Sequence, residues 1–286
     1  MKTKYQNPIL IGYADPDVYF ENGVYYLYAT SYRYDVWTST DLVHWEKKPN
    51  TAISAPVWGM DRWHWAPDVK RLPDGRLLMA ASVQEHLGLL TATSPEGPFV
   101  PEENFLFDHS IDGHIFIDDD GTIYLYYVSW RKDHRYGLYG CILDPATLKP
   151  VEGSERPIIY PEAPYECQQA PVAEAPYMLK FDGKYVLTYS GSHFESPFYC
   201  VAALLSDHPL EGFVRDETNP ILVGNTTEIS GCGHHCITTS PSGELALIYH
   251  THHAPGTIHP RDLAIDPLYW DGEHLTCPGP RKEGEI

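Results

Sequence analysis

A turn built on glycine and followed by an apolar run occurs five times along this chain of 286 residues. Typical segments are ENGVYYLYATS from Glu21, DDGTIYLYYV from Asp119 and FDGKYVLTYS from Phe181. Asn-Gly and Asp-Gly supply the positive φ angles that a tight β-hairpin requires. The five turn glycines, 52, 46, 62 and 60 residues apart, are Gly23, Gly75, Gly121, Gly183 and Gly243. This spacing indicates repeated antiparallel modules rather than one long sheet.

An acid or a histidine precedes each of these glycines by seven to nine residues. The five residues are Asp15, Asp68, Asp112, Glu174 and His234. In modules arranged around a common axis the first strand of each lines the central channel, so we expect these side chains to converge on one opening. The sequence therefore predicts an all-β fold, a single five-bladed β-propeller that occupies residues 1–286 as one catalytic domain. A β-sandwich is the rival fold, but it does not predict a repeated module of acid, strand and turn.

Composition limits the fold classes and binding partners that are possible for this chain. The 21 Tyr, 7 Trp and 25 Pro favour strands and structured loops. A formal net charge of −19 argues against nucleic acid and anionic membrane surfaces as partners, because both need a basic surface. No apolar stretch is long enough to span a membrane, and the first residues lack the apolar core of a secretory signal, so we expect a cytoplasmic location. The six cysteines form no CxxC pair and are expected to be free thiols.

Carboxyl groups that converge on one cavity suggest acid–base catalysis. Carboxyl groups that face one cavity repel each other, and burial raises the pKa of at least one, which then stays protonated near neutral pH. A proton donor beside an ionised base is the minimum for cleaving a glycosidic bond. An inverting reaction needs the two carboxyl groups about 6.5 to 9.5 Å apart, whereas a retaining pair lies about 5 to 5.5 Å apart. Residues on different blades suit the wider, inverting separation.

Three segments resemble the acid motifs of glycoside hydrolase family 43. They are NPILIGYADPDVYF from Asn7, SIDGHIFIDDDGTIYLYY from Ser110 and AEAPYMLKFDGKYVLTYSG from Ala173. Three further segments resemble other motifs of that family. They are HWAPDVKRL from His64, GCGHHC from Gly231 and RDLAIDPLYW from Arg261. The resemblance covers nearly the whole chain, and the motifs occur in the right order.

The resemblance implies a role for each acid. Asp15 matches the general base that activates water, and Glu174 matches the general acid that protonates the leaving oxygen. Asp112 matches the third carboxylate, which orients the acid and tunes its pKa. Inversion at the anomeric carbon without a covalent intermediate is then expected, and no cofactor is required.

Substrate-binding roles follow from the same resemblance for Trp65, His234 and Arg261. Trp65 is expected either to stack on a sugar face or to wedge between blades. Arg261 is expected to orient the base or to bind a hydroxyl. The histidine matching His234 faces the channel axis in the family and supports either a water-coordinated calcium ion or a hydrogen-bond network. A metal bound here would be a structural calcium, and since calcium prefers oxygen ligands a lone histidine makes a weak site.

Neighbouring acids compete with these assignments. Asp17 is the local alternative to Asp15 but lies deeper along the same strand. Glu162 and Glu166 are alternatives to Glu174, but they lie 21 and 17 residues before Gly183 and fall on the approaching loop. Asp68 is expected to be a structural acid of the second blade.

The predicted function is an exo-acting inverting hydrolase that removes arabinofuranosyl or xylosyl units from small plant-type oligosaccharides. The segment from Gly191 resembles exo-acting members, and a cytoplasmic location suits short substrates. One alternative is an endo-acting arabinanase or a galactan-directed member of the same family. An alternative from a different class is a non-catalytic carbohydrate-binding propeller, which would lose one of Asp15, Asp112 and Glu174.

Overall fold

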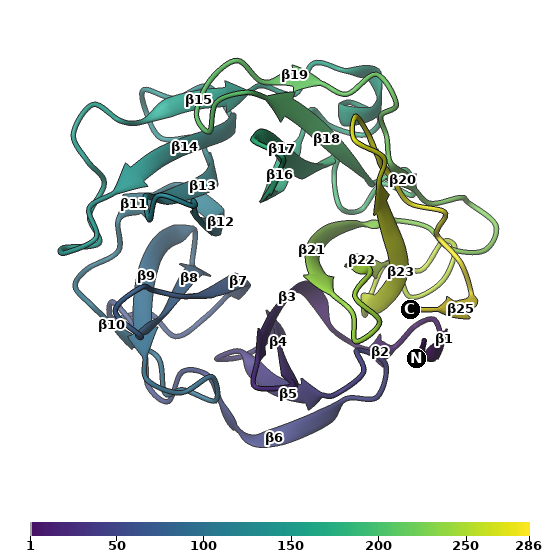
Figure 1. Ribbon diagram of the computed structural model, residues 1–286, viewed down its shortest axis with the longest axis horizontal. Helices are drawn as coiled ribbons and strands as arrows, with labels where there is room; N and C mark the ends of the chain where they lie inside the picture. The colour runs from purple at the N-terminus through teal and green to yellow at the C-terminus, as the bar shows by residue number, and fades with distance from the viewer. Residues whose placement is uncertain (1) are drawn as a thin grey trace.

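Five antiparallel sheets stand in a ring around a central channel in the computed structural model, which describes residues 2–286 (Figure 1). The chain is thus a five-bladed β-propeller, as the spacing of the glycine turns predicts. The first blade consists of β3 (Ala14–Glu21), β4 (Val24–Thr30), β5 (Asp35–Ser39) and β6 (Glu46–Thr51). The second consists of β7 (His64–Arg71), β8 (Leu77–Val83), β9 (His86–Ala92), β10 (Val100–Pro101) and β11 (Phe107–Asp108).

The remaining blades repeat this order from the channel outward. The third consists of β12 (Ser110–Ile117), β13 (Ile123–Ser129), β14 (Gly137–Leu143) and β15 (Arg156–Ile159). The fourth consists of β16 (Ala173–Phe181), β17 (Lys184–Gly191), β18 (Cys200–Ser206), β19 (Val214–Arg215) and β20 (Leu222–Val223), and the short 3-10 helix η1 (Pro164–Glu166) precedes it. The fifth consists of β21 (Gly233–Thr239), β22 (Leu245–Thr251), β23 (Asp262–Trp270) and β24 (Leu275–Thr276).

The two ends of the chain close the ring together. Strand β2 (Leu10–Ile11) comes from the N-terminal segment but pairs with β23 of the fifth blade, and β1 (Lys4–Gln6) pairs with β25 (Glu283–Glu285). The termini consequently lie side by side (Figure 1). Asn7 fastens this closure, because its side-chain amide donates to the carbonyls of Ile265 and Arg281 and its oxygen accepts the N–H of Ile265.

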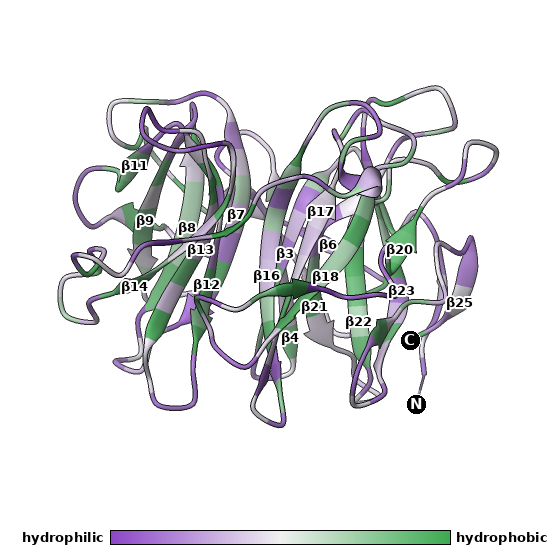
Figure 2. Cartoon of the chain, turned by 90° about the horizontal axis from the view of Figure 1, so that it is seen from above, coloured by the Kyte–Doolittle hydropathy of each residue, from purple (hydrophilic) through white to green (hydrophobic). Residues whose placement is uncertain are grey.

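Apolar side chains fill the spaces between neighbouring blades. Figure 2, a view from the side, shows green apolar stretches in strands such as β9 and β22, whereas the connecting loops are largely purple. Tyrosine suits these spaces because its ring packs in the core while its hydroxyl reaches a backbone acceptor. Tyr28 of the first blade donates to the carbonyl of Pro95 of the second, and Tyr126 of the third donates to Pro209 of the fourth. The high tyrosine content thus serves contacts between blades.

Each innermost strand contains one β-bulge near its start, where one extra residue interrupts the pairing with the next strand. Five residues, one at each bulge, have a positive φ: Asp15 (55°), Ala66 (42°), Asp112 (57°), Ala175 (51°) and His234 (43°). A positive φ is uncommon for residues other than glycine. The bulge turns the top of the innermost strand and redirects its side chains.

The bulges also show which residues of the blades are equivalent. Asp15, Asp112 and His234 share one position, Glu174 stands one residue earlier in its strand, and Asp68 stands two residues later. The prediction that all five converge on one opening is therefore wrong for Asp68. The residues with a positive φ lie eight or nine residues before the turn glycines, and in the second blade that residue is Ala66, nine before Gly75, whereas Asp68 lies only seven before it.

Below the bulges, side chains of the innermost strands bind the backbone of the next blade. Asp17 Oδ2 accepts the N–H of Val69 at 2.8 Å. Asp68 Oδ2 accepts the N–H of Ile115 at 2.9 Å, and the hydroxyl of Tyr177 donates to the carbonyl of Ile237 at 2.6 Å. Asp68 thus joins the second blade to the third, and Asp17 lies deeper than Asp15. Within the described residues no helix is long and apolar enough to span a membrane, and all six cysteines are unpaired.

Replacing Asn7 by Ala is expected to lower the free energy of unfolding by about 2 kcal/mol, because the variant loses three hydrogen bonds that close the ring. Urea unfolding measures the loss. Asn50→Ala, at an exposed position on β6, is the matched control and is expected to change stability by less than about 0.5 kcal/mol. Equal stability of the Asn7 variant and the wild type would contradict the account of ring closure.

Candidate active site

A pocket of about 810 Å³ opens at the end of the ring where the innermost strands begin. Three carboxyl groups of the innermost strands face it, from Asp15 on β3, Asp112 on β12 and Glu174 on β16, and Glu85 adds a fourth from the turn between β8 and β9. His234 and Arg261 complete its polar floor, and aromatic side chains form much of its wall. The aromatic residues are Trp65, Trp130, Tyr136 and Phe194. The structure thus brings every candidate site residue of the sequence analysis into one pocket.

Asp15 is buried at the junction of the first and the last blade, surrounded by donors. Arg261 reaches it with both terminal nitrogens, Nη1 at 2.9 Å from Oδ1 and Nη2 at 3.3 Å from Oδ2. Thr30 Oγ1 donates to Oδ2 at 2.6 Å, and the Nδ1 atoms of His250 and His234 lie 3.0 and 3.3 Å from Oδ1. Burial alone would raise the pKa of Asp15, but the Arg261 guanidinium together with His234 and His250 outweighs burial and holds that pKa well below its usual range. Asp15 is therefore ionised at neutral pH.

Glu174 has the opposite electrostatic environment. Burial raises the pKa of Glu174 to about 7, and the nearby charge of Asp15 adds to the rise. The hydroxyl of Tyr199 donates to Glu174 Oε1 at 2.7 Å, and this bond favours the ionised form. The ring of Tyr199 stacks on His250 at 5.4 Å between centroids, so one buried pair of rings supports both catalytic candidates. Glu174 can hold a proton near neutral pH.

Asp112 contacts the backbone beside Glu174. In three blades a hydroxyl of the second strand accepts the N–H of the next blade's bulge, as Ser82 Oγ does for Asp112 at 2.9 Å. Val128 holds the equivalent position in the third blade and has no hydroxyl. Asp112 Oδ2 instead accepts the N–H of Ala175, the residue after Glu174, at 3.2 Å. Burial and the charges of Glu174 and Asp15 raise the pKa of Asp112 well above its usual range.

Several residues of this site carry no motif in the sequence. Thr30, Tyr199 and His250 contact the carboxyl groups directly, yet they lie outside the repeated acid position: Thr30 and His250 are on second strands, and Tyr199 directly precedes β18. A histidine at the second-strand position where other blades have Thr30, Ser82 or Ser190 is the one available signal for His250. The structure also explains the glycine that pairs with His250, because a side chain at Gly233 would collide with the ring of Tyr199.

The channel beneath the pocket contains a second charged group. The ammonium of Lys70 lies 3.0 Å from Asp68 Oδ1 and 3.6 Å from Asp17 Oδ1. His114 Nδ1 lies 2.7 Å from Asp68 Oδ1. Burial and the neighbouring charge of Asp68 raise the pKa of Asp17 to about 7, although Lys70 acts in the opposite direction. These groups neutralise one another within the channel.

This arrangement offers a calcium ion few ligands. The carboxylates nearest to His234 are already paired, Asp15 with Arg261 and the deeper Asp17 and Asp68 with Lys70. Among residues 2–286 no group of three or more His, Cys, Asp or Glu side chains is placed to hold a metal ion. A calcium site at His234 stays a prediction that the geometry does not favour, and the chemistry proposed below uses no metal.

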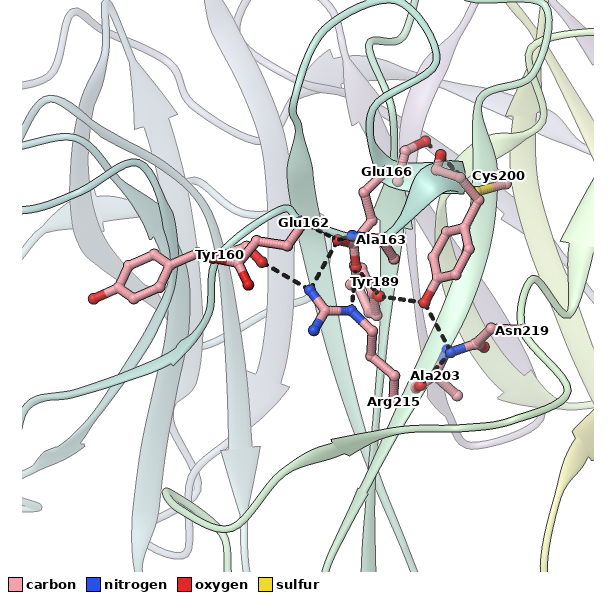
Figure 3. A network of polar contacts seen from close by, with 11 residues as sticks. Tyr160, Glu162, Ala163, Glu166, Tyr189, Cys200, Ala203, Arg215 and Asn219 are labelled. Carbon is pink, nitrogen blue, oxygen red and sulfur yellow. Dashed lines mark hydrogen bonds and ion pairs between the residues drawn. The ribbon is translucent and has the colours of Figure 1, made fainter.

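Glu166 belongs to a different network of side chains, which contains Arg215 and Tyr189 and none of the pocket-lining residues (Figure 3). Its side chain is fully buried in η1 and forms two bonds of 2.8 Å with Arg215. It also accepts the hydroxyl of Tyr189 and the N–H groups of Glu162 and Ala163. The carbonyl of Glu166 accepts the N–H of Val172, which lines the pocket. Glu166 therefore fixes the loop that leads into β16, and Glu162 is exposed outside the pocket.

Comparison with known proteins places the chain in context. Residues 5–275 match the family model described as Glycosyl hydrolases family 43. A β-D-galactofuranosidase from Aspergillus niger is 28% identical over 94% of this chain and 83% of its own length. An extracellular exo-α-(1→5)-L-arabinofuranosidase from Streptomyces chartreusis is 28% identical over 86% of this chain and 82% of its own length, and a β-xylosidase also matches. A solved thermostable family-43 glycoside hydrolase superposes with a TM-score of 0.88 at 33% identity, covering 97% of each chain.

Replacing Arg215 by Met is expected to lower the free energy of unfolding by about 2 to 3 kcal/mol, because the buried Glu166 carboxylate loses its charged partner. Thermal unfolding of the variant measures the loss. The double variant Arg215→Met, Glu166→Gln removes the unpaired charge and should recover part of it. A double variant less stable than Arg215→Met alone would contradict the assignment.

Proposed function

Because the chain belongs to glycosyl hydrolase family 43, we propose that this glycosidase is an inverting, exo-acting enzyme that removes arabinofuranosyl units from short oligosaccharides. The observation that carries the proposal is the division of charge within one pocket. Arg261 keeps Asp15 ionised, whereas burial keeps Glu174 protonated near neutral pH. A base and an acid on different blades are the two groups that single-step hydrolysis of a glycoside requires.

In the proposed reaction, Asp15 accepts a proton from a water molecule as the water oxygen attacks the anomeric carbon. The bond from that carbon to the leaving oxygen breaks, and Glu174 delivers its proton to the leaving oxygen. The new bond forms on the face opposite the broken one, so the configuration inverts. Asp15 then returns its proton to solvent, and Glu174 regains one.

The surrounding groups keep the two roles separate. Arg261 and Thr30 hold both oxygens of Asp15 in place, so its basic oxygen has a fixed direction. Asp112 fixes the backbone beside Glu174 through the N–H of Ala175 and contributes to a site that disfavours a further negative charge. These contacts support a pKa of Asp15 that stays below the pKa of Glu174 when substrate enters the pocket.

The exo mode and the furanosyl specificity rest on the pocket wall and on the relatives. Side chains of the second to fifth blades surround the carboxyl groups, among them Glu85, Trp130, Phe194 and His259. A pocket bounded on four sides suits a terminal sugar better than the middle of a chain. Two relatives that match over most of this chain are described as furanosidases, one of them as exo-acting. Xylosyl or galactofuranosyl release and endo action on arabinan are the alternative outcomes of a substrate screen.

Glu174→Gln and Asp15→Asn are each expected to lower kcat on the preferred aryl glycoside by about 10²- to 10⁴-fold, because each removes one proton-transfer group. Hydrolysis of nitrophenyl arabinofuranoside, xyloside and galactofuranoside measures the loss. Glu162→Gln is the matched control, because Glu162 is exposed in the segment that leads into β16, and it should keep wild-type activity. Equal activity of Glu174→Gln and an active wild type would contradict the role of Glu174 as the acid, and no activity in any form, wild type included, would favour a carbohydrate-binding propeller.

The pH profile of kcat/KM is expected to be bell-shaped. Activity needs Asp15 ionised, so it falls as the pH drops through a pKa held below the ordinary 3.8. It also needs Glu174 protonated, so it falls as the pH rises through about 7. A plateau that extends well above pH 7 with no alkaline limb would contradict the role of Glu174.

Tyr199→Phe is expected to move the alkaline limb to higher pH. The hydroxyl of Tyr199 stabilises the ionised form of Glu174, so its loss raises the pKa of that carboxyl. The acid limb, which belongs to Asp15, should keep its position. A shift of the alkaline limb to lower pH would show that another group controls it.

A further inference from the structure

An exposed tryptophan extends the aromatic wall of the pocket outward. Trp65 lines the pocket, and Trp63 stacks against it with ring centroids 5.8 Å apart and planes within 9° of parallel. Trp63 nonetheless keeps 59% of its surface exposed. The two indoles thus form a continuous apolar strip from the site of cleavage to the surface. A large exposed aromatic beside a binding pocket is a feature that needs an explanation.

Trp63 is held in this place by contacts around it. Its carbonyl accepts the N–H of Gln84 at 3.2 Å, from the turn between β8 and β9. Two residues earlier, Asp61 forms a two-point ion pair with Arg33, at 2.8 and 2.7 Å, and accepts the hydroxyl of Tyr32 at 2.8 Å. Both anchors come from the blades on either side of the segment. The indole face is therefore presented to solvent at a fixed position.

A polar group lies next to this strip. Glu85 follows Gln84 in the turn that anchors Trp63, and it lines the pocket. Its backbone carbonyl accepts the N–H of Ser110, which fixes the turn against the third blade. An aromatic face beside a carboxylate is the combination that a sugar ring requires, because its C–H face packs on the indole and its hydroxyls donate to the carboxylate.

We propose that Trp63 and Glu85 bind the sugar unit on the leaving-group side of the bond that is cleaved. The inference rests on the proposed function, which places the released sugar against Asp15 and Glu174. The remainder of the substrate then leaves the pocket through its mouth, and Trp65 connects the inner unit to the next one on Trp63. The ligand is a neutral oligosaccharide whose second unit sets the preference for chain length.

Two observations favour a sugar over a protein partner. One indole face is far smaller than the surface of about 1,000 Å² that a specific protein interface buries. The strip is also continuous with the pocket that holds the three carboxyl groups. A sugar unit bound there stays covalently attached to the unit at the reaction centre.

Steady-state kinetics of Trp63→Ala test the proposal with the methyl glycoside and with the disaccharide to the tetrasaccharide of the sugar that the wild type cleaves. The expected result is a rise in KM of about tenfold for the oligosaccharides with kcat nearly unchanged, because one aromatic contact is lost. For the methyl glycoside, which has no second sugar, KM should stay within about twofold of wild type. Glu85→Gln should raise the KM of the oligosaccharides by a smaller factor than Trp63→Ala.

Phe20→Ala is the matched control, because Phe20 is 49% exposed but lies near the far end of β3 from Asp15. It should leave every substrate unchanged. Titration of the tetrasaccharide into Glu174→Gln, with and without Trp63→Ala, gives the binding change without turnover. Equal KM changes for the methyl glycoside and the oligosaccharides, or none for either, would overturn the proposal. A wild type that cleaves no glycoside would overturn the proposed function as well, whereas cleavage without an effect of chain length would overturn the subsite alone.

Discussion

One extra residue in the innermost strand of each blade determines which side chains reach the pocket. The bulge places Asp15, Asp112 and His234 at a positive φ, a conformation that costs about 1 to 3 kcal/mol for residues other than glycine. Hydrogen bonds between blades offset this cost, since the bulge N–H groups of Ala66, Asp112 and His234 each find a hydroxyl of the preceding blade. The side chains that enter the pocket are therefore held by the closed ring and not by their own strand alone.

Closure of the ring also determines which carboxyl group of the site lies next to a positive charge. Asp15 belongs to the first blade and Arg261 to the last, so their ion pair exists only when β2 has joined the N-terminal segment to the fifth blade. The same junction brings His250 of the fifth blade next to Asp15, whereas Tyr199 and Glu174 meet within the fourth blade. Asp15 forms an ion pair with Arg261, whereas Glu174 is buried and forms none with the described residues. This difference makes Asp15 a base and Glu174 an acid. The fold and the proposed chemistry thus depend on the same contact between the ends of the chain.

Much of this organisation follows from the sequence, because a hairpin turn needs Gly at fixed points and the repeat counts the blades. The acids of the first, third and fourth blades could be found in the same way. Asp68 was misplaced because the second blade has Ala66 at the bulge, so that its nearest acid lies two residues further along the strand. Thr30 and His250 escaped notice because they act from second strands, where the pattern shows only a buried strand, and Tyr199 because it lies in the segment just before β18. The network of Glu166 and Arg215 joins residues 49 positions apart and has no local signal.

The central claim is that a water molecule activated by Asp15 attacks the anomeric carbon in a single step. Proton NMR of the sugar first released from an α-L-arabinofuranoside, recorded before the anomers equilibrate, tests it most directly. The account predicts that the β-anomer appears first, since the attack occurs on the face opposite the leaving group. First appearance of the α-anomer would show retention of configuration and would contradict the assignment of Asp15 as a base.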